Sequence, residues 1–368
     1  MLIPGFATLE GTERFRDRFK VRLPGHFRRT NNLWISSIGL GTYLGEPTAT
    51  YDQLYTEAVT RAAQSGINLF DSAINYRHQR SERSIGKALA AMFNSGALQR
   101  DEVILATKGG FLTFDGDEPA DPAAYFEEKL IKTGLVQAED VAAGCHVMSP
   151  AYLENQIELS RQNLGVETLD IYYLHNPETQ LGAVAREQFY GRLRAAFEAL
   201  EGAVAAGRIR FYGMATWNAF RVGPSSREAI SLVKALLAAR EAGGKDHHFR
   251  AVQLPFNFAM PEALVARSQE WDGKQVPFLE LAQARNLMVF ASASIMQGHL
   301  ASGLPAGIRN TFPRQRTDAQ RALQFVRSAP GVTCALVGMS RREHVDENIA
   351  TAAVPPLTAE EFRATVER

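Results

Sequence analysis

The 368-residue sequence predicts an α/β protein built as a single-domain (β/α)8 TIM barrel, preceded by an N-terminal extension. Two patterns lead to this prediction. Eight short apolar runs alternate with segments of helical periodicity along most of the chain. The runs are almost continuously apolar, as expected for parallel strands that helices cover on their outer side. The length is also compatible with one barrel core.

The strands are expected where β-branched and aromatic residues cluster, at 36–41, 67–71, 103–108, 169–175, 209–215, 251–256, 287–293 and 332–339. The helices are expected between them, at 52–64, 81–93, 150–164, 189–206, 226–241, 277–285, 318–328 and 341–351. Two helix starts carry a local signal. Ser149 precedes Pro150, and Thr317 lies three residues before Gln320, which is the spacing of a capping box.

An open, doubly wound sheet is the alternative architecture, because it also alternates strands and helices. Its dinucleotide-binding form carries a glycine fingerprint between the first strand and a helix that begins at once. The segment at 39–45 is rich in glycine, but no helical pattern begins directly after it. The barrel is therefore favoured.

Two segments interrupt the alternation: an extension at 1–34 and a long connection at 109–148. The barrel domain is accordingly expected at 35–368. The extension is basic at 14–29 and is interpreted as a charged cap on the barrel, with an interaction arm as the alternative.

The connection at 109–148 is too long for a simple loop, and Asp121 followed by Pro122 predicts a short helix inside it. It is either a lid over the pocket or a surface insertion packed on the rim. The lid would have an apolar wall, made of Phe111, Phe114, Tyr125, Phe126 and Leu130. Cys145 and His146, near its end, are interpreted as structural.

Composition narrows the range of functions. The chain has 40 Lys and Arg against 40 Asp and Glu, and a balanced charge disfavours binding to nucleic acids or membrane surfaces. Two distant cysteines predict neither disulfides nor a thiolate metal site. The first 20 residues lack the apolar stretch of a signal peptide, and no run reaches the length of a membrane span. A cytoplasmic protein acting on a small molecule is expected.

Polar side chains are expected at the carboxyl ends of four strands, where a barrel has its active site: Asp71, Lys108, His175 and Gln253. Asp71 and Lys108, on adjacent strands, are expected to form an ion pair. Tyr76 lies five residues after Asp71, in a loop able to fold over the same end. An ammonium stabilises a phenolate, so Lys108 would help Tyr76 to donate a proton to a carbonyl. His175 would orient that carbonyl.

Each of these residues also has a structural explanation when it is taken alone. Asp71 could be a turn residue or half of a structural salt bridge, and Lys108 an exposed lysine at a strand end. His175 could be a turn histidine. Their occurrence together at one end of neighbouring strands favours a catalytic site.

A second candidate site lies at 338–348, where a strand ends and a helix begins. Ser340, Arg341 and Arg342 would place backbone N–H groups and guanidinium groups there, which is the chemistry of an anion site. The alternative is that Ser340 and Glu343 form a capping box.

The segments 67–89, 101–108, 164–178 and 337–349 together resemble the aldo-keto reductase superfamily, in particular its bacterial NADP-dependent members and the related potassium-channel β-subunit branch. The resemblance extends from about Arg29 to Ala352. It implies a TIM barrel that reduces aldehydes and ketones with NADPH. It assigns Tyr76 as general acid, tuned by Lys108 and Asp71, and His175 as the residue that orients the carbonyl.

The resemblance also implies a set of cofactor-binding residues and no metal. Thr42 and Tyr43 would line the nicotinamide end, Ser340 and Arg341 would contact the 2′-phosphate, and His344 would face the adenosine. The complete set is Thr42, Tyr43, Asp71, Thr216, Gln253, Ser294, Ile295, Gly298, Gly338, Ser340, Arg341, His344, Glu347 and Asn348.

Four positions depart from the family pattern. Ala215 and Thr216 occupy the places of a Ser and an Asn that bind the carboxamide. Ser292 occupies the place of a stacking aromatic residue, and Ser294 that of a proline. An NADPH-dependent carbonyl reductase is the leading hypothesis. An NAD-dependent aldose dehydrogenase and a non-catalytic cofactor-sensing subunit are the alternatives, and the oligomeric state stays open.

Overall fold

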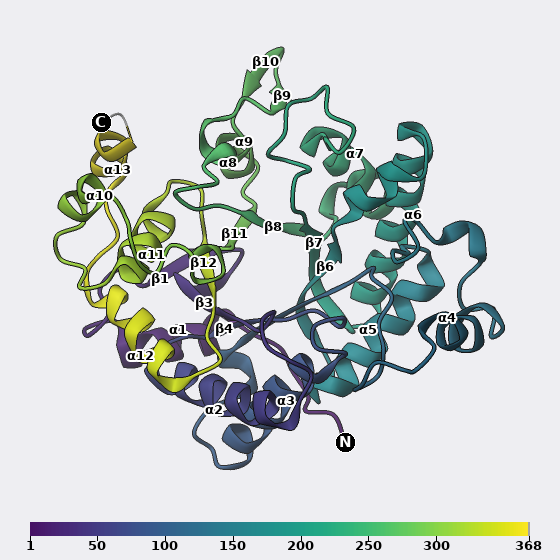
Figure 1. Ribbon diagram of the computed structural model, residues 1–368, viewed down its shortest axis with the longest axis horizontal. Coiled ribbons are helices and arrows are strands. Elements are labelled where there is room, and N and C mark those ends of the chain that lie inside the picture. Colours follow the sequence, from purple (N-terminus) through teal and green to yellow (C-terminus); the bar gives the residue numbers. More distant parts are fainter. Residues whose placement is uncertain (367–368) are drawn as a thin grey trace.

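A closed barrel of eight parallel strands forms the centre of the computed structural model, which describes residues 1–366 (Figure 1). The strands are β3 (Ile38–Gly41), β4 (Leu69–Asp71), β5 (Ile104–Gly109), β6 (Leu169–His175), β7 (Ile209–Ala215), β8 (Phe249–Pro255), β11 (Met288–Ser292) and β12 (Cys334–Gly338). They follow each other in chain order around the barrel, and the pairings of β12 with β3 and of β11 with β8 close it. The predicted fold is confirmed, and the open sheet is excluded.

One helix follows each barrel strand and packs outside it, so that the chain runs around the ring in order (Figure 1). These helices are α2 (Ala49–Ser65), α3 (Arg80–Asn94), α5 (Pro150–Leu164), α6 (Arg186–Ala205), α7 (Leu232–Gly243), α9 (Phe278–Ala284), α11 (Asp318–Ser328) and α12 (Arg342–Ala350). Six smaller elements lie between or beyond them: α4 (Pro122–Phe126), α8 (Glu262–Val265), α10 (Ala306–Thr311), α13 (Ala359–Val366) and the hairpin of β9 (Gln269–Trp271) with β10 (Lys274–Val276).

The apolar residues form two layers of core. One layer fills the inside of the barrel with residues such as Ile171, Met288 and Phe290. The other fills the space between the strands and the helices, with Phe70 and Val252 among its members. Strands with apolar side chains on both faces therefore read as continuous apolar runs.

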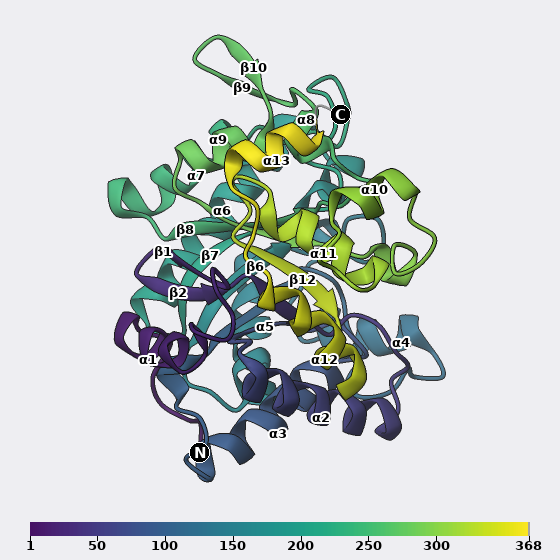
Figure 2. The same cartoon turned by 90° about the vertical axis from the view of Figure 1, so that its left-hand side faces the viewer.

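The N-terminal extension closes the amino end of the barrel. It forms α1 (Leu9–Phe19) and a hairpin of β1 (Phe27–Thr30) with β2 (Leu33–Ser36), seen on the left in Figure 2, opposite α4 and α10. Leu33 and Ile35 are fully buried in the inner core. Arg14 and Arg18 of α1 form ion pairs with the buried Glu102. The extension is therefore a cap that contributes apolar side chains as well as charge to the barrel.

The two ends of the connection between β5 and α5 pair with each other at residues 110–111 and 146–147, and we call this paired segment its neck. Phe111 pairs with His146 in an antiparallel bridge, and Val147 N donates to Gly110 O over 2.7 Å. The predicted short helix is α4, which Asp121 caps by accepting from Ala124 N over 2.9 Å. A turn of π-helix at Glu127–Ile131 follows it.

Two local predictions need correction. The helix predicted at 226–241 begins only at Leu232, because 226–230 forms turns, and Ile230 N donates to Ala219 O. Thr317 accepts from Gln320 N, whereas the Gln320 side chain accepts from Arg316 N and leaves the box incomplete. The start of α5 is as predicted, with Ser149 at the N-cap and Pro150 in the first turn, although the Ser149 hydroxyl has no partner among residues 1–366.

The start of α12 also bears on Ser340. Its N-cap is Arg341, and the structure gives this cap no side-chain hydrogen bond within the described chain. The capping box of Ser340 and Glu343, which was the alternative to an anion site, therefore does not form, and the hydroxyl of Ser340 is left for another role. Over the described residues, no helix combines the length and the apolar character needed to cross a membrane.

Candidate active site

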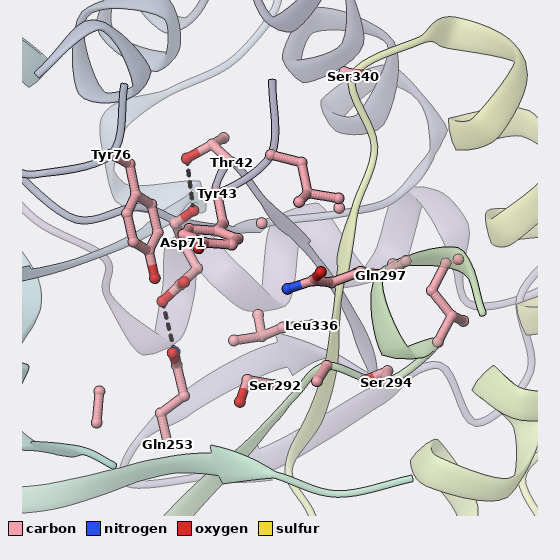
Figure 3. A pocket seen from close by; sticks show the side chains of 18 of the residues that line it. Thr42, Tyr43, Asp71, Tyr76, Gln253, Ser292, Ser294, Gln297, Leu336 and Ser340 are labelled. Atoms are coloured by element: carbon pink, nitrogen blue, oxygen red, sulfur yellow. Dashed lines mark hydrogen bonds between the residues drawn. The ribbon is translucent and has the colours of Figure 1, made fainter. Parts of the chain in front are cut away.

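A cavity of about 730 Å³ opens at the carboxyl ends of the barrel strands. Residues within two positions of the ends of seven strands line it: Thr42, Asp71, His175, Thr216, Gln253, Ser292 and Gly338. From there it extends past 293–298 to the start of α12. Figure 3 shows Tyr76, Asp71 and Gln253 close together and Ser340 at a distance from them. The cavity thus has a strand-end half and a half at α12.

Asp71 and Lys108 form the predicted ion pair. Lys108 Nζ donates to Asp71 Oδ1 over 2.6 Å and to the carbonyl oxygen of Ser72 over 2.6 Å. The lysine is fully buried. Burial is the largest single influence and would lower its pKa, but Asp71 and Tyr76 together outweigh burial and raise the pKa of Lys108 above its usual value. The result is a fixed ammonium at the base of the cavity.

Two further hydrogen bonds hold Asp71, one at its side chain and one at its main chain. Gln253 Nε2 donates to Asp71 Oδ2 over 2.7 Å, so that both carboxylate oxygens accept a hydrogen bond (Figure 3). The Thr42 hydroxyl donates to the Asp71 carbonyl oxygen over 3.1 Å. β4 and its neighbours therefore fix the carboxylate in one orientation.

Tyr76 lies against this pair from the loop after β4. Lys108 Nζ is 4.8 Å from the centroid of the Tyr76 ring. The ring also contacts Tyr43 and His175 edge-on, at centroid distances of 5.0 and 5.7 Å. Burial raises the pKa of Tyr76, and Lys108 opposes this rise by stabilising the phenolate. The hydroxyl is thus protonated at neutral pH and lies near a group that favours proton loss.

His175 ends β6 and is neutral. Burial, followed by the nearby charge of Lys108, holds the pKa of His175 well below its usual range. Its Nδ1 has no hydrogen-bond partner in the described part of the chain. A neutral imidazole in this place can donate to or accept from a carbonyl compound in the cavity.

The residues predicted to bind the carboxamide lie beside this group. The Thr216 hydroxyl is buried and lacks a partner within residues 1–366, so the cavity has an unsatisfied polar group at this end. Ala215 and Ser292 line the cavity next to it. The small side chains that depart from the family pattern therefore widen this end of the cavity.

Most residues predicted for the other half of the cofactor also line the cavity: Ser294, Ile295, Gly298, Ser340, His344, Glu347 and Asn348. The Ser294 hydroxyl donates to Ala291 O over 3.0 Å, so its oxygen can only accept a hydrogen bond from a ligand. Arg341 is different, because it does not line the cavity and its side chain is exposed at the N-cap of α12. Lys108 lies beneath the lining.

Of the proposed lid residues, only Phe111 lines the cavity, 5.0 Å from His175 between ring centroids. Phe114 and Phe126 stack on each other at 4.9 Å, outside the lining. Trp217, which was not predicted from the sequence, also lines the cavity and is 45% exposed. Its place directly after the predicted strand end at 209–215 was the available signal.

The described residues contain no group of three His, Cys, Asp or Glu side chains that could hold a metal ion. Cys145 and Cys334 are free thiols.

The sequence profile of the Aldo/keto reductase family matches residues 37–302. The uncharacterized oxidoreductase YqkF of Bacillus subtilis (strain 168) is 24% identical over 356 residues, covering 91% of this chain and 93% of that protein. Two solved structures have the same fold. An aldo/keto reductase from Klebsiella pneumoniae in complex with NADP and acetate has a TM-score of 0.62 at 23% identity, over 93% of this chain and 94% of that one. The holo form of an aldo-keto reductase from Bacillus halodurans has a TM-score of 0.63 at 21% identity, over 93% and 95%.

Proposed function

The chain belongs to the aldo/keto reductase family of oxidoreductases, and we propose that it transfers a hydride from NADPH to the carbonyl carbon of a small aldehyde or ketone. One observation carries the proposal: a protonated tyrosine, a fixed ammonium and a neutral histidine meet at one end of an elongated cavity. This combination suits the protonation of a carbonyl oxygen.

In the proposed reaction Tyr76 is the general acid. As the carbonyl carbon accepts the hydride, negative charge builds on the oxygen and the Tyr76 hydroxyl delivers its proton there. Lys108 stabilises the phenolate that remains, and Asp71 holds the ammonium in place. His175 orients the substrate oxygen. Because charge develops mainly in the transition state, these fixed groups lower the barrier more than they strengthen ground-state binding.

The residues around the cavity fit a dinucleotide. The cavity is long enough to join Tyr76 to the start of α12, and Thr216 offers an unsatisfied hydroxyl at the strand-end half. At the other half Ser340 lines the cavity just before the N-terminus of α12, where backbone N–H groups attract anions. A bound NADPH would supply the hydride. The NADP-bound Klebsiella relative supports the choice of cofactor.

Arg341 is the proposed determinant of NADPH over NADH. It is exposed and lies next to Ser340, so a 2′-phosphate at that end could be reached by a side-chain rotation. On this proposal Arg341→Ala weakens the binding of NADPH and leaves the binding of NADH unchanged.

The test is the loss of NADPH absorbance when the purified chain meets an activated aromatic aldehyde, with NADH in a parallel series. We expect turnover with NADPH and weaker activity with NADH. Cofactor binding is measured by fluorescence titration in the same samples. Tight binding without turnover on a panel of aldehydes and ketones would contradict the reductase function, and absence of binding would contradict the cofactor assignment.

A further inference from the structure

His146, which the proposed mechanism does not use, is fully buried directly behind His175. Its Nε2 lies 2.8 Å from the carbonyl oxygen of His175, and its Nδ1 lies 2.9 Å from Gln180 Nε2. Gln180 is also fully buried, in the 3-10 turn at Pro177–Gly182. Its Oε1 accepts from Arg192 Nη1 of α6 over 2.6 Å. Four residues thus form one continuous chain of hydrogen bonds that ends at His175.

This chain of hydrogen bonds has only one possible direction of donation. A guanidinium group has no acceptor, so Arg192 must donate and Gln180 must turn its oxygen toward it. The Gln180 amide nitrogen then faces His146 and donates to Nδ1. Burial lowers the pKa of His146 to about 4, so the ring is neutral and carries its single proton on Nε2. That proton is donated to the His175 carbonyl oxygen.

A second contact joins the same two histidines. The ring of Phe111 meets His146 and His175 edge-on, at centroid distances of 5.2 and 5.0 Å and interplanar angles of 90° and 88°. His175 is therefore held at its main-chain carbonyl by His146 and at its ring by Phe111. The next residue, Asn176, has a φ of 45°, so the backbone turns sharply at this point and the hydrogen bond fixes the peptide plane.

The hydrogen-bond chain also includes the long connection between β5 and α5. His146 lies in the neck of that connection, and Arg192 Nη2 donates to the carbonyl oxygen of Glu139 over 2.8 Å. The same guanidinium group thus binds the connection and starts the chain that leads to His175.

We infer that His146 and Gln180 are positioning residues, which hold His175 through a one-directional chain of hydrogen bonds and link the 109–148 connection to the active site. The effect on turnover rests on the proposed function, whereas the placement of the proton does not.

The direct test is 15N NMR of the full-length protein with labelled histidine rings, which distinguishes protonated from unprotonated ring nitrogens. His146 is assigned from the signals lost in His146→Gln. We expect a neutral ring with its proton on Nε2. In Gln180→Glu the side chain accepts from Arg192 but cannot donate to His146, so Nδ1 of His146 should become protonated. A proton on Nδ1 in the wild-type protein, or an unchanged His146 signal in Gln180→Glu, would overturn the inference.

The second readout is His175 itself. His146→Leu should shift the ring signals of His175 and lower kcat by about 10- to 100-fold through misplacement, with cofactor affinity unchanged. His146→Gln should recover part of kcat, because its amide can donate to the same carbonyl. The matched control is His26→Leu. His26 lies in the N-terminal extension and is equally buried, and its Nε2 lies 3.1 Å from the carbonyl oxygen of Gly66.

His26→Leu should lower stability without moving the His175 signals. Identical His175 signals in His146→Leu and the wild type would contradict positioning. Absence of carbonyl turnover in the wild type would instead contradict the proposed function, while the NMR result would still decide the direction of the chain.

Discussion

Lys108 carries a buried positive charge that Asp71 balances. Burial removes both charges from water, and specific contacts must compensate for the lost hydration. Lys108 Nζ donates to Asp71 Oδ1 over 2.6 Å and also to Ser72 O, while Gln253 donates to the other carboxylate oxygen of Asp71. The pair is therefore sensitive to the loss of either partner. Its value to the mechanism is a fixed ammonium beside the ring of Tyr76.

Removal of that charge should destabilise the fold. Lys108→Met leaves Asp71 buried without its partner, which is expected to lower the free energy of unfolding by about 3–5 kcal/mol. Adding Asp71→Asn should restore part of the loss, because the unpaired charge disappears. Urea unfolding of the single and double variants measures both effects. Lys87→Met, on the exposed face of α3, is the control, and an equal effect at the two lysines would contradict a buried ion pair.

Individual site residues could be predicted from the sequence where a polar side chain ends an apolar strand. Asp71, Lys108 and His175 were predicted to share one end of the barrel because consecutive parallel strands end there, and the structure brings them together. His146 was interpreted only as structural. Its role depends on contacts with Gln180 and His175, which are distant in sequence and have no periodic signal.

At Gly213, neighbouring strands lie so close together that the position has no room for any side chain. It lies in β7 beside the register shift between Tyr212 and Gly213, and a Cβ there would be 1.7 Å from the carbonyl oxygen of Ala251 in β8. Any side chain would push the two strands apart. The strands carry Thr216 and Gln253 into the cavity, so their spacing affects the site as well as the fold.

We expect Gly213→Ala to lower the free energy of unfolding by at least about 2 kcal/mol, because backbone and not a flexible side chain must move. Thermal unfolding measures the loss. The matched control is Gly202→Ala in α6. Apart from its chain neighbours and the adjacent helix backbone, no atom of the described chain lies within 4 Å of the new Cβ, and helix propensity favours Ala by about 1 kcal/mol. Similar stability of the two variants would contradict the close approach of β7 and β8.

Elements were more predictable than their ends. All eight barrel strands were expected from apolar runs, and each lies within a few residues of its predicted range. The helix at 226–241 was placed too early because its first residues are polar and compatible with either a helix or a turn. These residues form turns that tertiary hydrogen bonds hold, from Ile230 N to Ala219 O and from the Arg186 side chain to the carbonyl oxygens of Ser226, Arg227 and Ala229. Capping boxes failed for the same reason, since their second hydrogen bond depends on the path of the chain.

For the molecule as a whole, we expect buried neutral histidines to make the free energy of unfolding fall as the pH falls. Burial lowers the pKa of His26 to about 3 and that of His146 to about 4. In the unfolded chain a histidine binds a proton below about pH 6.5. Between pH 6.5 and these values the unfolded state therefore binds more protons, and stability falls as the pH falls.

In that window, each of these two histidines should lower the free energy of unfolding by up to about 1.4 kcal/mol for every unit by which the pH falls. Urea unfolding at pH 7, 6 and 5 measures the slope, and His26→Gln should make it shallower. Stability that stays constant from pH 7 to pH 5 would contradict the neutral, buried state of both rings.

Tyr76→Phe is the most direct test of Tyr76 as the proton donor in hydride transfer to a carbonyl, because this substitution removes only the hydroxyl. NADPH affinity and NADPH-dependent aldehyde reduction are measured on the same sample. The control is Tyr190→Phe, since the Tyr190 hydroxyl accepts from Ser231 N. We expect unchanged NADPH affinity and a loss in kcat of about 10²- to 10⁴-fold. A Phe variant that reduces the aldehyde at the wild-type rate would contradict the role of Tyr76 as general acid.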